Sequence, residues 1–241
     1  MYLSNKGRTK VKYKNIKEAR FISRPNRFIA KVDIDGEKIT VHVKNTGRCR
    51  ELLVPGCRVF LERAENPERK TPYDLIAVEK IREDGKAILI NMDSQVVNVA
   101  AEEWLKKGEL FSHSAIIRRE VTYENSRFDF YIEDGDEKAF LEVKGVTLER
   151  GGEVLFPDAP TERGVKHLRE LCECIKDGYS AYVLFVIQMK GVTHFRPNDE
   201  MHRAFGDALR EAYRAGVKIL AMDCSIEPDS IEIDKEIKVI L

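Results

Sequence analysis

Several features that would place this chain in a special class are missing from its 241 residues. No apolar run reaches the length of a membrane span, and the basic N-terminus has no apolar segment of the kind that directs export. The five cysteines are odd in number and lack paired CxxC spacing, which argues against a disulfide framework and a zinc site. Glutamine is almost absent from a sequence that is 34% charged, a composition more usual in thermophiles. We therefore predict a cytoplasmic protein with reduced cysteines and no membrane partner.

The formal net charge is zero, but charge is unevenly distributed along the chain. Residues 1–50 contain fourteen Lys or Arg against four Asp or Glu, a balance of +10 that the remainder offsets with −10. A basic end on a neutral protein suggests a polyanionic partner such as nucleic acid. The alternative is a solubilising basic segment over residues 5–20, which is the commoner role of a charge run.

Residues 18–90 have the pattern of short β-strands. The segment RFIAKVDIDGEKITVHVKN alternates on both sides of Asp35-Gly36, and a second strand pair surrounds Asp84-Gly85, both typical hairpin turns. Four or five short strands with no helix between them predict a small closed barrel. An OB-like barrel fits this number and length of strands.

From about residue 92 the pattern becomes mixed. The segments SQVVNVAAEEWLKKG, TERGVKHLRELCECIKDG and DEMHRAFGDALREAYRAG predict helices, and Thr161 stands at the capping position of the second. The apolar run AYVLFVIQM predicts a strand that is covered on both faces. The order helix, three strands, helix, strand, helix, strand predicts an α/β domain with a mixed central sheet. We place the two domains at residues 1–90 and 91–241.

Two charged residues in the strand AFLEVKGV are the first candidates for chemistry. Glu142 and Lys144 are two residues apart and therefore point to the same face. A hairpin through EDGDEK can bring Asp129 beside Glu142, and two converging carboxylates repel each other unless a cation joins them. Mg²⁺ commonly binds one or two carboxylates, waters and a substrate phosphate. The carbonyl of Val143 offers a further oxygen, and Lys144 could act on an attacking water or stabilise transition-state charge.

The same residues allow a simpler interpretation, in which Glu142 and Lys144 form a surface ion pair of little energetic value. Against it, the flanking residues are apolar, and a buried carboxylate is costly unless it is paired or binds a metal. An Asp followed by a spaced Glu-x-Lys also occurs often by chance. The triple by itself therefore leaves both interpretations open.

The order of elements around the triple resembles the core of the PD-(D/E)xK nuclease superfamily. A closer resemblance, over about residues 20–225, is to the sugar fermentation stimulation protein A family. It rests on RFIAKV, VKNTGRCREL and PGCRV, on RFDF and EVKGVTLE, and above all on the long block FPDAPTERGVKHLREL. This resemblance implies a nucleic-acid-binding protein with an N-terminal OB-like domain and a C-terminal nuclease-like domain.

The resemblance also implies roles for individual residues. Asp129 and Glu142 would bind Mg²⁺ or Mn²⁺, and Lys144 would be the catalytic lysine. Superfamily members often place one more acid on the first core helix, where Glu102 and Glu103 are the candidates and Glu103 is preferred. A solvated helix face is the equal alternative for both.

Basic residues in two segments are candidate contacts with nucleic acid. One group follows the start of the helix after FPDAP, where a helix N-terminus favours phosphate, and comprises Arg163, Lys166 and His167. Without the resemblance, Arg163 would be read as a surface ion pair and His167 as a partly buried helix residue. The second group surrounds NTGR in the first domain and comprises Arg27, Lys44, Arg48 and Arg50. The nearby aromatics Tyr13, Phe21 and Phe28 are expected to fill the barrel, so we predict a basic surface without base stacking.

The sequence thus predicts a DNA-binding nuclease that hydrolyses phosphodiester bonds with Mg or Mn, on single- or double-stranded DNA. The alternative is a non-catalytic DNA-binding regulator linked to sugar metabolism, with a vestigial nuclease fold. A third interpretation is a scaffold whose Glu-x-Lys residues form a buried ion pair. A Lys144 that bonds only to Glu142 would favour the non-catalytic interpretations. The oligomeric state is open, with a homodimer as one option.

Overall fold

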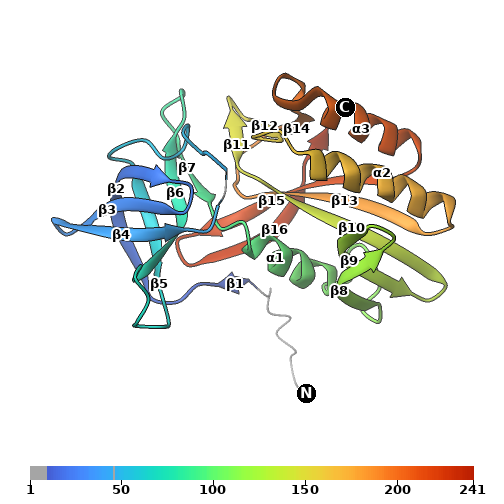
Figure 1. Cartoon of the computed structure of the whole chain (residues 1–241), viewed down its shortest axis with the longest axis horizontal. Coiled ribbons are helices and arrows are strands. Elements are labelled where there is room, and N and C mark those ends of the chain that lie inside the picture. Colours follow the sequence, from blue (N-terminus) through green and yellow to red (C-terminus); the bar gives the residue numbers. More distant parts are fainter. Residues whose placement is uncertain (1–9, 46) are drawn as a thin grey trace, which may run out of the picture.

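The computed structural model describes residues 10–45 and 47–241; residues 1–9, part of the basic N-terminal segment, lie outside the described residues. Figure 1 shows two parts, a β-barrel from the N-terminal third of the chain and a larger part in which helices cover a twisted sheet. Among the described residues no helix is long and apolar enough to cross a membrane.

The N-terminal sheet has six strands: β2 (Ile16–Asn26), β3 (Ile29–Ile34), β4 (Glu37–Val43), β5 (Arg58–Arg63), β6 (Tyr73–Ile81) and β7 (Ala87–Asn91). Their order is β4-β3-β2-β5-β6-β7, and an additional pairing of β4 with β6 closes a five-stranded barrel. Asp35 (φ 53°) and Gly36 (φ 90°) turn β3 into β4 with the positive φ angles that such a tight hairpin requires. The predicted OB-like barrel and its hairpins are confirmed.

The larger part contains a seven-stranded sheet of β1 (Val11–Lys12), β8 (Ile116–Tyr123), β9 (Ser126–Asp134), β10 (Glu137–Val146), β13 (Ser180–Ile187), β15 (Lys218–Glu227) and β16 (Ser230–Glu236). Its order is β1-β16-β15-β13-β10-β9-β8, with β10, β13 and β15 parallel and the other pairings antiparallel. The predicted mixed sheet is therefore confirmed. Strand β1 belongs to this sheet and not to the barrel, so Val11–Lys12 pair with the second domain although they precede the first in the sequence.

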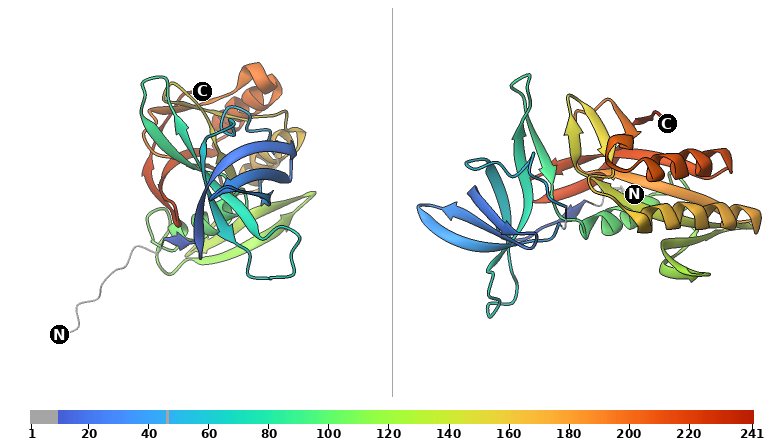
Figure 2. Two further views of the ribbon diagram at one scale, coloured as in Figure 1. Left: turned by 90° about the vertical axis from the view of Figure 1, so that its left-hand side faces the viewer. Right: turned by 45° about the horizontal axis from the view of Figure 1, so that its top comes forward.

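Three helices cover this sheet: α1 (Val96–Leu105), α2 (Glu162–Lys176) and α3 (Asp199–Arg214). Helix α1 packs on one face, and α2 and α3 lie side by side on the other (Figure 2). The apolar strand β13 is buried on both faces, as its sequence predicts. Thr161 caps α2, with its hydroxyl accepting the Gly164 N–H at 3.1 Å.

A small sheet extends from the end of β10 and consists of β11 (Leu148–Arg150), β12 (Glu153–Phe156), β14 (His194–Pro197) and β17 (Lys238–Val239). Its first strand carries Glu149, whose side chain is fully enclosed. The Lys80 ammonium group from the barrel lies 2.6 Å from one carboxylate oxygen of Glu149, and Arg82 Nε lies 3.0 Å from the other. The two domains are therefore joined by a buried ionic cluster.

The ionisation of Glu149 depends on its partners. Burial alone would raise its pKa, but hydrogen bonds from Lys80 and the Gly152 N–H, with the charges of Lys80 and Arg82, hold the pKa below the ordinary 4.5. A depressed folded-state pKa means that the carboxylate stabilises the fold above pH 4.5. That contribution is lost as the pH falls through the folded-state pKa.

We predict that Glu149→Gln lowers the free energy of unfolding by about 3 kcal/mol at pH 7, because it leaves two buried cations without their anion. Urea titration followed by the fluorescence of Trp104, the single tryptophan, measures the loss. The difference from wild type should narrow below pH 4.5. Asp35→Asn is the matched control, because Asp35 pairs with Lys17 on the exposed surface and should have no measurable effect. A loss for Glu149→Gln that stays constant from pH 7 to pH 3 would contradict this account.

Candidate functional site

The candidate site forms where β9 and β10 separate. Their antiparallel pairing ends at Leu141 and Phe130, one residue before Glu142 and Asp129. Beyond that point the Asp129 side chain takes the place of a strand partner, and its Oδ2 accepts the Val143 N–H at 2.8 Å. The predicted approach of Asp129 to the Glu142 strand therefore arises from a local opening of the hairpin.

Glu142 is buried, with 4% of its surface exposed. Its Oε1 accepts two hydrogen bonds, from Lys144 Nζ at 2.6 Å and from His167 Nδ1 at 2.5 Å. Its Oε2 is also buried, yet it has no hydrogen-bond partner among the described residues. A buried, unsatisfied carboxylate oxygen is costly, so this atom points to a ligand or a cation that completes the site.

The two carboxylates differ in their ionisation. Burial would raise the pKa of Glu142, but the hydrogen bond from His167 and the Lys144 charge outweigh burial and keep its pKa below the ordinary value. Burial, followed by repulsion from Glu142, raises the pKa of Asp129, despite hydrogen bonds from Val143 and Asn98. Without a cation, the site stabilises the ionised form of Glu142 and disfavours ionisation of Asp129.

His167 faces Glu142 from helix α2. The imidazole is 3% exposed, and its other nitrogen, Nε2, lies 3.3 Å from Nε of Arg163. Both ring nitrogens thus have protein partners, so the side chain holds Glu142 where the resemblance suggested a phosphate contact. Arg163 itself is exposed, and exposed Lys166 donates to the Asn125 carbonyl at 2.6 Å.

Helix α1 contributes a residue that the sequence did not single out. Asn98 donates to Asp129 Oδ1 at 2.7 Å and so fixes the second carboxylate. Glu103 instead faces Lys106 at 3.6 Å, and Glu102 pairs with Lys106 and with Arg119 on β8. An asparagine near a helix start is usually a surface residue, which is why the sequence gave no reason to choose it.

Within residues 10–45 and 47–241, no three His, Cys, Asp or Glu side chains gather as a metal-binding cluster. The protein part of any metal site here is therefore limited to two carboxylates and backbone oxygen. This set is the one that leaves most coordination positions to water and substrate.

One of the predicted basic residues of the barrel, Lys44, faces acidic side chains. Its ammonium group lies 3.3 Å from Asp93, 3.5 Å from Asp74 and 3.7 Å from Glu62, so it neutralises acids inside the barrel wall. Lys44 as a nucleic-acid contact stays a prediction, and these three carboxylates would compete with a phosphate for its charge. Charge counting along the sequence could not reveal these neighbours.

The other three predicted arginines of this surface, Arg27, Arg48 and Arg50, are exposed. Arg24 holds their two loops together. It donates to the carbonyls of Arg27, Arg48, Gly47 and Asn45 at 2.6–2.8 Å.

The aromatic side chains near this surface divide into two groups. Phe21 is buried in the barrel core, as expected, whereas Tyr13 is buried in the cluster around α1 and not inside the barrel. Phe28 is 45% exposed, with the Arg27 guanidinium 4.8 Å from its ring centre. The expectation that all three fill the barrel is therefore corrected for Tyr13 and for Phe28, which lies in the turn between β2 and β3.

Comparison with known proteins identifies this arrangement. Residues 22–90 match the family model described as the SfsA N-terminal OB domain, and residues 95–230 match the sugar fermentation stimulation protein RE domain. The chain belongs to the sugar fermentation stimulation protein family. Its relatives in this family include a homolog from Desulfitobacterium hafniense strain DCB-2, 60% identical over 222 residues, or 92% of this chain and 95% of that protein. A homolog from Clostridium beijerinckii is 57% identical over 231 residues, or 96% of this chain and all of that protein.

A solved structure of this family extends the likeness to three dimensions. The structure of Pyrococcus furiosus SfsA in complex with Ca²⁺ superimposes with a TM-score of 0.84 at 28% identity. The match covers 96% of this chain and 98% of that one. The barrel and the α/β domain are thus shared over the full length of this family member.

We predict that Asp129→Asn stabilises the protein by about 1 kcal/mol at pH 7 in metal-free buffer. The raised folded-state pKa means that ionised Asp129 opposes folding, and the neutral amide removes that cost. The gain should be absent below the ordinary pKa of 3.8, where the wild-type side chain is also neutral. Urea titration in EDTA measures it.

Asp134→Asn on the same strand is the matched control for this prediction. The pKa of Asp134 is held below its ordinary value by hydrogen bonds from Ser112, so this variant should lose stability. A loss of stability in Asp129→Asn at pH 7 that disappears below pH 3.8 would contradict the repulsion, because a loss caused only by missing hydrogen bonds would persist at low pH.

Proposed function

We propose that this family member is a divalent-metal-dependent nuclease of the PD-(D/E)xK type that hydrolyses phosphodiester bonds in DNA. The observation that carries the proposal is the buried Oε2 of Glu142, which has no donor among the described residues and lies beside a second carboxylate. A cation is the partner that would satisfy this oxygen and relieve the repulsion with Asp129.

The residues fit Mg²⁺ or Mn²⁺. Glu142 would bind through Oε2, because Lys144 and His167 already occupy Oε1. Asp129 accepts one hydrogen bond on each oxygen and keeps lone pairs free for a metal. The Val143 carbonyl is the third candidate oxygen. The Ca²⁺ complex of the Pyrococcus furiosus relative supports a divalent cation in this family, and two carboxylates with open positions suit Mg²⁺.

The chain's own groups have separable tasks in this mechanism. A bound cation would polarise the phosphate and lower the pKa of a water. Lys144 would place its ammonium group against the charge that develops on the phosphate in the transition state. When Lys144 turns from Glu142 to the substrate, His167 still donates to Oε1 and keeps the carboxylate in position. Asn98 does the same for Asp129.

The second candidate function, a non-catalytic DNA-binding regulator, is favoured by one contact. Among the described residues, Lys144 has Glu142 as its only hydrogen-bond partner. A lysine used only to neutralise a buried carboxylate would be arranged in the same way. The regulator interpretation does not explain why the buried Oε2 of Glu142 has no hydrogen-bond partner among the described residues.

DNA would be bound by the exposed arginines of the barrel and of α2. Arg27, Arg48 and Arg50 lie on two loops that Arg24 ties together, so their charges act on one surface. Arg163 and Lys166 lie in the first turns of α2, the helix whose His167 reaches Glu142. Phosphates on such surfaces are bound without reading sequence.

For the metal site we predict that Glu142→Gln weakens Mn²⁺ binding at least tenfold by titration calorimetry, whereas Lys144→Met leaves it within a few-fold. Both variants should lose Mg²⁺-dependent cleavage of a labelled oligonucleotide by about a hundredfold or more. EDTA should abolish wild-type cleavage. Wild-type protein that binds DNA and Mn²⁺ but cleaves neither single- nor double-stranded DNA would select the regulator. Cleavage by Glu142→Gln at the wild-type rate would refute the site.

For the basic surface we predict a salt-dependent affinity. Arg48→Ala should reduce the slope of log K against log salt by about 0.9 on duplex DNA, the amount expected for one lost phosphate contact. Arg214→Ala, which removes an exposed arginine at the end of α3, should leave the slope unchanged. Fluorescence anisotropy between 50 and 200 mM salt, a range over which several phosphate contacts change affinity by about a thousandfold or more, measures both. Equal slopes for the wild type and Arg48→Ala would show that Arg48 does not contact the DNA phosphates.

A further inference from the structure

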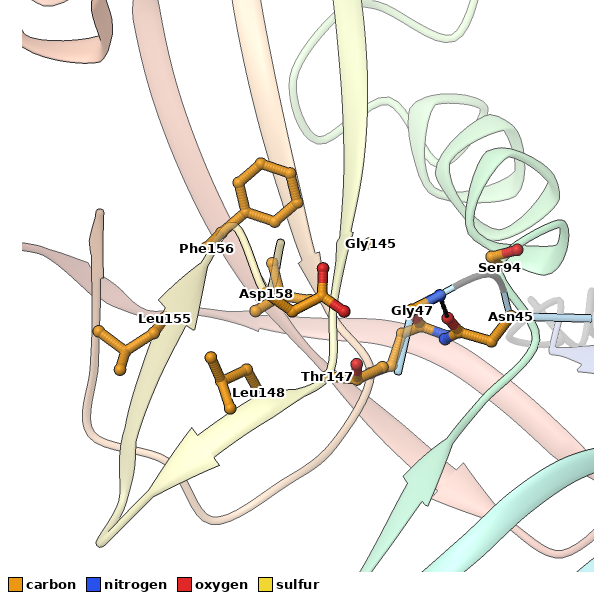
Figure 3. Close-up of a pocket in the computed structure, with 11 residues that line it drawn as sticks. Asn45, Gly47, Ser94, Gly145, Thr147, Leu148, Leu155, Phe156 and Asp158 are labelled. Atoms are coloured by element: carbon orange, nitrogen blue, oxygen red, sulfur yellow. Dashed lines mark hydrogen bonds between the residues drawn. The ribbon is translucent and has the colours of Figure 1, made fainter. Parts of the chain in front are cut away.

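A pocket of about 140 Å³ lies between the barrel and the α/β domain. Figure 3 shows its wall: Asn45 and Gly47 come from the barrel loop, and Asp158 comes from the segment that leads into α2. Gly145, which follows the proposed catalytic Lys144 on β10, also lines it. The pocket therefore needs both domains, and the strand that carries the proposed site forms part of its wall.

The charge of the pocket excludes a phosphate. Asp158 is the single charged residue that lines it, and its carboxylate has no hydrogen bond or ion pair among the described residues. A carboxylate accepts hydrogen bonds through two oxygens and donates none when ionised. Within a nucleic acid, whose phosphates a carboxylate repels, the complementary partner is therefore a base edge with adjacent N–H donors.

Two other polar side chains of the pocket, Asn45 and Gln188, can form hydrogen bonds with other atoms of such a ligand. Asn45 Oδ1 accepts the Gly47 N–H at 2.8 Å, which leaves the Asn45 NH₂ group free to donate. Gln188 uses its NH₂ group on Asn91 and Asp93, so its carbonyl oxygen remains as an acceptor. Phe156 adds an aromatic side chain to the wall.

The shape of the pocket depends on a glycine. A Cβ atom on Gly47 would lie 2.3 Å from Oδ2 of Asp158, closer than any side chain can approach. The barrel loop is thus fitted directly against the carboxylate. This contact fixes Asp158 at the domain boundary without using its hydrogen-bonding capacity.

We infer that this pocket binds one unpaired guanine base of the nucleic acid, with the adjacent N1–H and N2–H of guanine donating to the two oxygens of Asp158. The Asn45 amide donates to guanine O6, and the apolar wall covers the ring, as in sites that read an extruded base through its Watson–Crick edge. The inference rests on the proposed function. It adds a base preference that phosphate contacts cannot supply.

The test compares oligothymidylate strands that carry a single central deoxyguanosine, deoxyinosine or deoxyadenosine. Inosine keeps O6 and N1–H and lacks the N2 amino group, so it removes one donor of the proposed pair. Anisotropy in EDTA with wild-type protein should show the guanine strand binding about tenfold more tightly than the inosine strand. EDTA prevents metal-dependent cleavage, so the result does not depend on the metal site.

Two substitutions of Asp158 test whether the guanine preference arises in this pocket. Asp158→Asn should abolish the preference while it leaves the affinity for plain oligothymidylate unchanged. Asp158→Ala, which removes both acceptor oxygens, should do the same. Unfolding midpoints close to that of the wild type show that the variants are folded, and the wild-type comparison of guanine with inosine needs no variant.

Equal affinity of the wild type for all three strands would overturn the inference and leave DNA binding intact. A guanine preference that persists in Asp158→Asn would also overturn it, because the preference would then arise elsewhere. Failure of the wild type to bind any strand would overturn both the base pocket and the DNA-binding part of the proposed function.

Discussion

Burying an ionised carboxylate costs several kcal/mol unless partners replace its water, and Glu142 is 4% exposed within the central sheet. Much of the surrounding architecture supplies those partners. Lys144 comes from the same strand and His167 from a helix on one face of the sheet. Asn98, on helix α1 at the opposite face, donates a hydrogen bond to Asp129. One oxygen, Oε2, is left without a partner by this arrangement, and the proposed chemistry begins there.

The domain junction is made by the strand that follows the one carrying that carboxylate. Strand β10 carries Glu142 and leads into β11, where Glu149 binds Lys80 and Arg82 of the barrel. One continuous stretch of chain thus connects the proposed site to the surface that would bind DNA. The pocket around Asp158 lies along the same path.

Much of this fold follows from local sequence patterns. The hairpin at Asp35-Gly36 and the cap at Thr161 were predictable because each depends on a few adjacent residues. The contacts that define the site were harder, because they join distant segments. His167 bonds a carboxylate 25 positions away, and Lys80 meets Glu149 across 69 positions. No periodicity encodes such pairs, so the partners of Glu142, apart from its strand neighbour, required the three-dimensional structure.

In the proposed function, one divalent cation binds both Oε2 of Glu142 and the Asp129 carboxylate. Crystals soaked in Mn²⁺ and measured for anomalous scattering test this most directly, because the signal locates the ion independently of activity. We expect an anomalous peak between Oε2 of Glu142 and the Asp129 carboxylate, at a distance suited to direct coordination. A map with no peak at this position, in crystals whose Mn²⁺ is clearly bound elsewhere on the protein, would contradict it.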